Sequence, residues 1–251
     1  MSNAIKDLLF KMADDALIIG HRNSEWTGIG PMLEEDLAFS SMAQDKIGHA
    51  HALYKILHEQ FGEAEPDVLG FKRSTKEFKC CQFVELPIGE YDFSLVRHFL
   101  FDHAEVIRYE MLATSSFQPL ALLAKKVKGE IKYHTMHADI FLIQLGKGNE
   151  EANARLQSSL NEAWHYALGI FEESEFENEL ISNGVFAGEK ELCNNWLKKV
   201  LPIIEAANLK VPATDESKIV FGGRNSYHSE FLQPLLTEMT EVVASDPAAE
   251  W

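Results

Sequence analysis

The sequence predicts an all-α fold, built as a four-helix bundle with additional C-terminal helices. Apolar residues recur in steps of three and four along several long stretches, which is the spacing of a buried helix face. Glycine and proline separate these stretches and mark the loops between them. A chain of 251 residues can bury a substantial core, so we expect one domain over residues 1–251. The core bundle is expected at about residues 3–147 and the extra helices at about residues 150–245.

The first predicted helix covers about residues 3–20 and ends at Gly20, a usual signal for a helix C-terminus. Its apolar seam includes Ala16 and contains no ionisable residue. The second predicted helix covers residues 31–61, and two polar residues interrupt its apolar stripe at adjacent places. The seam of this second helix consists of Phe39, Met42, Lys46, His49, Leu53 and Ile56.

Two further long helices complete the predicted bundle. The third, about residues 92–114, has one polar residue in its seam, a carboxylate. The fourth, about residues 120–145, again carries one histidine in its seam, with Ile131 three residues before it. The polar residues of the four facing seams are therefore Lys46, His49, Asp102 and His134.

The remaining segments predict connections and covering helices. Residues 62–91 are longer than a tight bundle turn needs, so we expect a packed surface arm with at most one short strand or hairpin near residues 81–86. The acidic cluster at residues 172–179 is interpreted as a solvated helix end. A sixth helix is expected at residues 189–208, with a kink or an early stop caused by Pro202, and a last helix is expected from about Ser226.

Composition excludes several classes of function. A net charge of −16 argues against nucleic-acid binding, because neutralising phosphates requires Lys and Arg. No apolar run is long enough to span a bilayer. The cysteines Cys80, Cys81 and Cys193 show no metal-type spacing, and the N-terminal residues show no secretory pattern. We therefore expect reduced thiols and a cytoplasmic protein.

The seam residues invite comparison with ferritin-like di-metal carboxylate proteins. Those proteins use one Glu from each of two helices and a Glu-x-x-His pair from each of two others, because residues at i and i+3 share one helix face. Here His49 and His134 stand where each motif would end. The positions three residues before them hold Lys46 and Ile131, so both motif glutamates are missing.

These segments resemble a known family. Residues 44–49 resemble the Gln-Asp-Glu-x-Gly-His element of the iron-binding subunit of phenylacetyl-CoA oxygenase (1,2-epoxidase), with Lys46 in place of the ligand Glu. Residues 130–134 resemble its Glu-Glu-x-Phe-His element, with Ile131 in place of the ligand Glu. The C subunit of the same complex, which is its non-catalytic ferritin-like component, is similar along nearly the whole chain. The matching segments are Ser24-Glu25-Trp26, residues 28–38, Gly222-Gly223, His228-Ser229-Glu230 and Thr237-Glu238-Met239.

The resemblance implies a ferritin-like fold and a non-catalytic structural role in the multicomponent oxygenase of aerobic phenylacetate catabolism. It implies that the chain docks against the di-iron catalytic subunit and stabilises it, with self-association within the complex as a second option. Iron would reside in that partner, and this chain would bind no cofactor itself. We accordingly assign no catalytic, cofactor-binding or metal-ligating residue, and expect no nucleic-acid or membrane partner.

The lysine in the second seam has a physical explanation. We expect Lys46 to replace the metal as the cation of a vestigial site. It would pair with Asp102, and with Glu130 or Asp45 as a second carboxylate, so that no buried charge stays uncompensated.

Two alternatives stay open. The residues His49, His134 and Asp102 have the composition of the two-histidine, one-carboxylate triad of mononuclear non-haem iron oxygenases. The chain could then be a metal-dependent oxygenase in its own right, whereas a di-iron or iron-storage site would need the missing glutamates. The other alternative is an interaction module without any remnant of the chemistry.

Overall fold

The computed structural model describes residues 2–246, and every regular element in this range is a helix. The predicted all-α fold is therefore confirmed. None of the described helices is long and apolar enough to cross a membrane. The α-helices are α1 (Ser2–Ser24), α2 (Leu33–Phe61), α3 (Pro66–Phe71), α4 (Gln82–Glu85), α5 (Tyr91–Leu112), α6 (Gln118–Gly146), α7 (Glu150–Leu168), α8 (Glu177–Ser182), α9 (Glu189–Ala206) and α10 (Leu232–Ser245). The 3-10 helices are η1 (Thr75–Glu77), η2 (Gly169–Phe171), η3 (Glu216–Lys218) and η4 (Gly223–Asn225).

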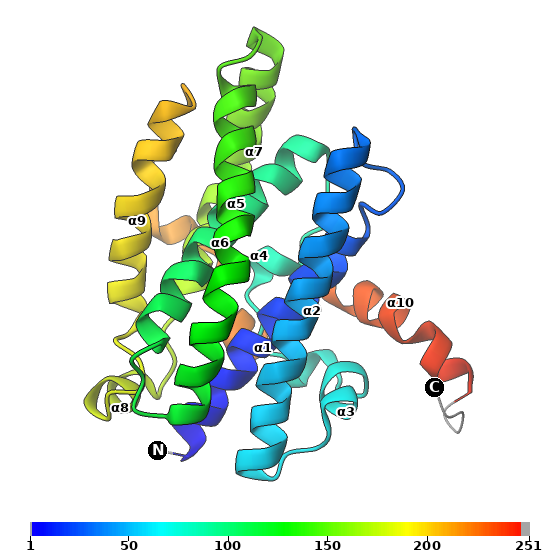
Figure 1. The fold of residues 1–251 in the computed structure, drawn as a ribbon, viewed down its shortest axis with the longest axis vertical. Helices are drawn as coiled ribbons and strands as arrows, with labels where there is room; N and C mark the ends of the chain where they lie inside the picture. The colour runs from blue at the N-terminus through cyan, green and yellow to red at the C-terminus, as the bar shows by residue number, and fades with distance from the viewer. Residues whose placement is uncertain (1, 247–251) are drawn as a thin grey trace.

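Two helix pairs form the bundle (Figure 1). Helix α1 packs along α2, and α5 packs along α6, while α2 also contacts α6 across the join between the pairs. Helices α7 and α9 then pack against α5. This is the predicted ferritin-like four-helix bundle with additional C-terminal helices.

Local signals set the limits of the long helix α2. Its first turn carries Glu34, Glu35 and Asp36, whose negative charges favour the positive end of the helix dipole. It ends at Gly62, which takes a left-handed conformation with φ 71° and donates its N–H to the carbonyl of His58. The connection from α2 to α5 thus begins at a glycine, which can take this left-handed conformation without strain.

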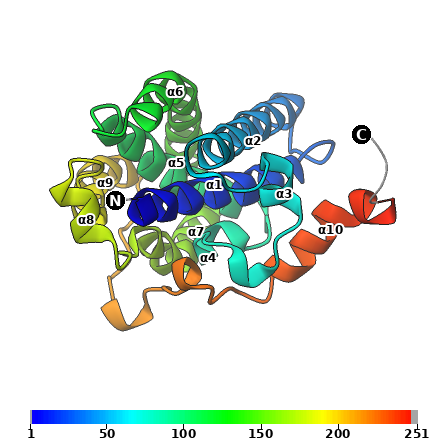
Figure 2. The same ribbon diagram turned by 90° about the horizontal axis from the view of Figure 1, so that it is seen from below.

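Helix α1 is enclosed on more sides than one seam predicts (Figure 2). The predicted seam is buried, but so are Lys11, Asp14 and Asp15 on its other face. The expectation that α1 stops at Gly20 is wrong, because the helix continues to Ser24. A side chain at position 20 would lie 3.0 Å from Ile47 Cγ1, so this glycine allows α1 and α2 to approach closely.

The buried charges of α1 are paired with segments distant in sequence. Asp15 accepts bonds from both terminal nitrogens of Arg224, each at 2.7 Å. Lys11 contacts the carboxylate of Glu189 at the start of α9, and Arg108 of α5 contacts the same carboxylate. These pairs attach the C-terminal half of the chain to the bundle.

The arm at residues 62–91 contains short helices, and the expected short strand or hairpin does not form there. Residues 81–86 form α4 and its caps, and no strand exists in the described part of the chain to pair with them. The apolar residues Phe83 and Val84 are fully buried, so their β-like composition reflects burial. The N–H of Cys81, just before α4, donates to Asp15 Oδ1 at 2.8 Å.

Two expectations for the C-terminal half are wrong. The acidic cluster is not simply solvated, because Glu172 is nearly buried and accepts the N–H of Gly222 at 2.8 Å. Pro202 does not stop α9, which continues past it to Ala206. Both Pro202 and Lys198, whose carbonyl loses its partner, are exposed, so water can satisfy that carbonyl.

The last helix also begins later than predicted. Helix α10 starts at Leu232 rather than near Ser226. Ser226 has φ 67°, a left-handed value that no right-handed helix can contain. The following residues, His228 and Ser229, bind the carboxylate of Glu85 in place of joining a helix.

Glu189 provides a test of how the C-terminal half is attached. Burial alone would raise its pKa, but Arg108 and Lys11 outweigh burial and lower the pKa to about 2. The charged carboxylate therefore stabilises the fold above its ordinary pKa of 4.5, and this contribution of about 3 kcal/mol is lost as the pH falls toward 2.

We predict that Glu189→Gln lowers the free energy of unfolding at pH 7 by about 3–5 kcal/mol, because two buried cations lose their counter-charge. Urea unfolding between pH 7 and pH 2 measures this loss and should show a weaker acid dependence in the variant. Glu191→Gln, an exposed residue of the same helix, should change stability by less than about 0.5 kcal/mol. Equal effects of the two substitutions would contradict the assignment.

Candidate functional site

The centre of the bundle holds an ion cluster around Lys46. This side chain is fully buried on α2, and its Nζ lies 2.5 Å from Asp102 Oδ1 of α5. It also contacts the carboxylate of Glu105, one turn further along α5. The predicted pairing with Asp102 is confirmed, but the second carboxylate is Glu105 and not Glu130 or Asp45.

Electrostatics keep this cluster ionised. Burial alone would lower the pKa of Lys46, but Asp102 and Glu105 outweigh burial and raise it above its ordinary value. Burial alone would raise the pKa of Asp102, but His98 and Lys46 outweigh burial and lower it far below its usual range. The ammonium and the carboxylate therefore stay charged at neutral pH and compensate each other away from water.

The two seam histidines are bound across the join between α2 and α6. The Nε2 atom of His49 lies 2.7 Å from Glu130 Oε2, and that of His134 lies 3.0 Å from Asp45 Oδ2. Each helix thus supplies a carboxylate four residues before its own histidine, and this carboxylate binds the histidine of the other helix. Burial is the main cause that lowers the pKa of His49, despite the nearby carboxylates.

Further histidine–carboxylate pairs lie in the same layer, and the seam analysis missed them. His98 contacts the second oxygen of Asp102 on α5. Glu35 of α2 binds His137 Nε2 at 3.0 Å and the Tyr91 hydroxyl at 2.6 Å. The spacing of four between His98 and Asp102 was a signal for the first pair. One buried face was expected for this helix, whereas α5 is buried on more than one, so the pair of His98 and Asp102 was not predicted.

The ligand set does not fit a di-metal centre of the Glu-x-x-His type. Lys46 and Ile131 are fully buried at the two motif positions, and Ala16 is likewise fully buried on α1. An ammonium between carboxylates repels a metal cation and already neutralises the negative charge that would bind it.

The mononuclear triad is not assembled either. The Nε2 atoms of His49 and His134 each bind a different carboxylate, Glu130 and Asp45. Whichever ring nitrogen is considered, the possible ligand atoms of His49, His134 and Asp102 do not all lie within 4.8 Å of one another. In the described residues, one group of three or more possible ligand atoms lies within 4.8 Å of one another, and it is elsewhere: Cys80, Glu85 and His228.

The spaces beside the cluster are small. A cavity of about 10 Å³, lined in part by Met12, Phe101 and Glu105, has room for one water at most. A groove of about 180 Å³ runs along His49 and Glu130. Ordinary small-molecule sites occupy about 300–1,000 Å³, so neither space suits a CoA thioester.

Sequence comparison identifies the family to which this bundle belongs. The profile of the phenylacetic acid catabolic protein family matches residues 1–251. The chain belongs to this family. The C subunit of the 1,2-phenylacetyl-CoA epoxidase of Escherichia coli (strain K12) is 28% identical over 249 residues, which covers 99% of this chain and 100% of the relative. The A subunit of the same epoxidase is 23% identical over 195 residues, which covers 76% of this chain and 62% of the relative.

We predict that Lys46→Met destabilises the protein by about 3–5 kcal/mol, because Asp102 and Glu105 lose the buried cation that compensates them. Lys55→Met, on the same helix but with a 59% exposed side chain, should cost less than about 1 kcal/mol. Chemical unfolding measures both values.

A double-mutant cycle with Asp102→Asn isolates the interaction itself. The coupling energy between positions 46 and 102 should be about 1–3 kcal/mol. A coupling energy near zero would show that the contact between Lys46 and Asp102 does not hold the two helices together.

Proposed function

We propose that this chain is the non-catalytic structural subunit of a 1,2-phenylacetyl-CoA epoxidase in aerobic phenylacetate catabolism. The observation that carries the proposal is the ammonium of Lys46 bound by Asp102 and Glu105, at the position of a metal-ligand glutamate. The end-to-end similarity to the C subunit of such an epoxidase, against a partial similarity to its A subunit, supports the same assignment.

In this proposal the chemistry takes place in a related protein of the same complex. A partner that resembles the A subunit would hold the iron, bind the aryl-CoA thioester and insert oxygen, with electrons from a separate reductase. This chain would hold no cofactor and would stabilise the partner as a second, related bundle. The alternative of an independent oxygenase rests on His49, His134 and Asp102, and the way these side chains are bound to other groups weighs against it.

An apolar surface patch suggests where the partner docks. It comprises Ile29, Met32, Leu33 and Leu37, in the turn before α2 and its first turns, and each is 50–68% exposed. Four large apolar side chains so close in sequence form a surface that another protein would normally cover. We assign this patch to the iron-bearing partner, because a related bundle could present apolar helix residues to it.

The test is co-expression of this chain with an iron-bearing partner that resembles the A subunit, followed by size-exclusion chromatography and an epoxidation assay to which the reductase, its electron donor and oxygen are added. The two chains should co-elute, and only fractions that contain the partner should consume phenylacetyl-CoA. Turnover by this chain alone, or separate elution of the two chains, would overturn the proposal.

We predict that the double substitution Leu33→Asp, Leu37→Asp lowers the apparent affinity of this chain for the partner at least 10-fold, because a charge at a buried interface must be desolvated. The two chains should then elute separately. Both changes lie near the positive end of α2, so the fold itself should tolerate them. Val242→Asp on α10, also an exposed apolar position at 61%, is the matched control and should bind normally. If the patch mediates self-association instead, the double variant will change the oligomeric state of the chain alone and leave co-elution intact.

A further inference from the structure

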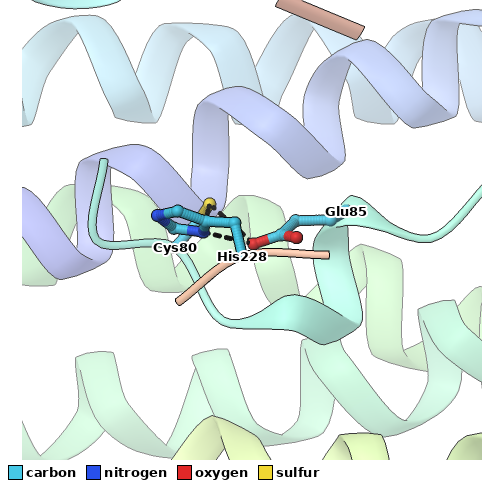
Figure 3. Close-up of side chains that lie close together, drawn as sticks. All are labelled: Cys80, Glu85 and His228. Carbon is cyan, nitrogen blue, oxygen red and sulfur yellow. Dashed lines mark hydrogen bonds and ion pairs between the residues drawn. The ribbon is translucent and has the colours of Figure 1, made fainter. Parts of the chain in front are cut away.

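Three potential metal ligands outside the Lys46 cluster converge on one another (Figure 3). Cys80 and Glu85 belong to the arm that includes α4, and His228 belongs to the segment before α10. Glu85 Oε1 lies 2.6 Å from His228 Nδ1 and 3.6 Å from Cys80 Sγ. Cys80 Sγ lies 4.0 Å from His228 Nδ1. The side chains of Cys80 and Glu85 are fully buried, and that of His228 is 5% exposed.

The outer atoms of these ligands are already bound. Glu85 Oε2 accepts hydrogen bonds from the N–H and the hydroxyl of Ser229 at 2.7 and 2.6 Å. His228 Nε2 lies 3.0 Å from the carbonyl oxygen of Phe78, to which it must donate. Metal-bound carboxylates and imidazoles are normally oriented by such bonds to their second atoms. The arrangement leaves Oε1, Nδ1 and Sγ facing one another.

The hydrogens on His228 and Cys80 follow from the hydrogen bonds that these side chains make. Because the carbonyl of Phe78 only accepts, the neutral imidazole of His228 has its hydrogen on Nε2 and a lone pair on Nδ1. At 2.6 Å from a carboxylate oxygen, that Nδ1 needs a hydrogen between itself and Oε1, and a metal ion bound to both atoms could take the place of this hydrogen. Burial and the nearby carboxylates raise the pKa of the Cys80 thiol, which is therefore protonated when no metal is present.

We propose that Cys80, Glu85 and His228 form a binding site for one divalent cation of the zinc class. Sulfur, imidazole and carboxylate are the ligands that zinc accepts in tetrahedral sites, with bonds of about 2.0–2.3 Å. Those bonds place neighbouring ligand atoms about 3.4–3.7 Å apart. The separations of Cys80 Sγ from Glu85 Oε1 and from His228 Nδ1 are within about 0.4 Å of this range. Only the distance between Nδ1 and Oε1, now 2.6 Å, must increase when the ion binds. The three side chains leave a fourth tetrahedral position, which a water molecule would fill.

Binding conserves the charge of this buried site. Without metal, the thiol is neutral and the proton shared by His228 and Glu85 balances the carboxylate. A divalent cation displaces two protons, one from Cys80 Sγ and one from the contact between His228 and Glu85. Its two positive charges then balance one thiolate and one carboxylate, so the net charge remains zero and no uncompensated charge is buried.

The ion would cross-link the segment before α10 to the arm that contains α4. Glu85 is the last residue of α4 and Cys80 lies just before that helix, whereas His228 lies more than a hundred residues later, shortly before α10. Closing such a long loop with a ligand that binds the folded state raises stability in proportion to the logarithm of metal concentration. This role concerns the attachment of α10 and does not depend on the proposed epoxidase function.

The experiment titrates the purified, reduced full-length protein with Co²⁺, a spectroscopic substitute for zinc. One equivalent should bind, with a thiolate-to-cobalt absorption band, and one equivalent of Zn²⁺ should abolish that band. Cys80→Ser should remove the band, and Ser229→Ala should weaken binding about 10–100-fold through Glu85. His228→Gln should weaken binding at least as strongly.

The control is Cys193→Ser, which removes the most accessible thiol of the chain. This variant should bind as the parent does, and its melting temperature should rise with Zn²⁺ as in the parent. A titration of the parent without a thiolate band would overturn the proposal, even if Cys80→Ser failed to fold. So would a band that survives in Cys80→Ser or disappears in Cys193→Ser.

Discussion

A lysine ammonium in the middle of a helical bundle can exist only if carboxylates compensate its charge. Lys46 is fully buried, so the side chains around it are constrained to provide that compensation. Asp102 and Glu105 supply it from successive turns of α5. These two contacts fix the position of α2 along the axis of α5. The histidines around it are a separate case, because a buried imidazole needs a hydrogen-bond partner, and carboxylates provide one for His49, His134 and His137.

A second set of buried ions makes α1 the internal axis of the molecule. The charges of this face need partners that the four bundle helices do not supply, and Arg224 and Glu189 provide them from later parts of the chain, by binding Asp15 and Lys11. The extra helices are therefore more than a covering layer. They complete the electrostatic neutralisation of the first helix, which explains why residues near the C-terminus pack against residues near the N-terminus.

The long helices could be predicted from sequence because a seven-residue apolar period records one buried face directly. An apolar period does not reveal a second buried face that carries charges. The burial of Lys11, Asp14 and Asp15 on α1 was therefore not predicted. The pairing of Lys46 with Asp102 was predicted because both lie on seams. The seams did not reveal Glu105 as the second partner, because Glu105 lies outside the seam assigned to its helix. They did not reveal the cluster of Cys80, Glu85 and His228, because its members come from segments distant in sequence. Cys80 and His228 are 148 residues apart and share no spacing pattern.

The central claim is that Lys46 takes the place of a metal in an inactivated ferritin-like site. Its most direct test is the iron content, by elemental analysis, of the chain expressed alone in iron-rich medium, compared with a variant carrying Lys46→Glu and Ile131→Glu. We expect no bound iron in the parent chain and iron uptake by the variant, in which both motif glutamates are present. Stoichiometric iron in the parent, bound at His49, His134 and Asp102, would contradict the account.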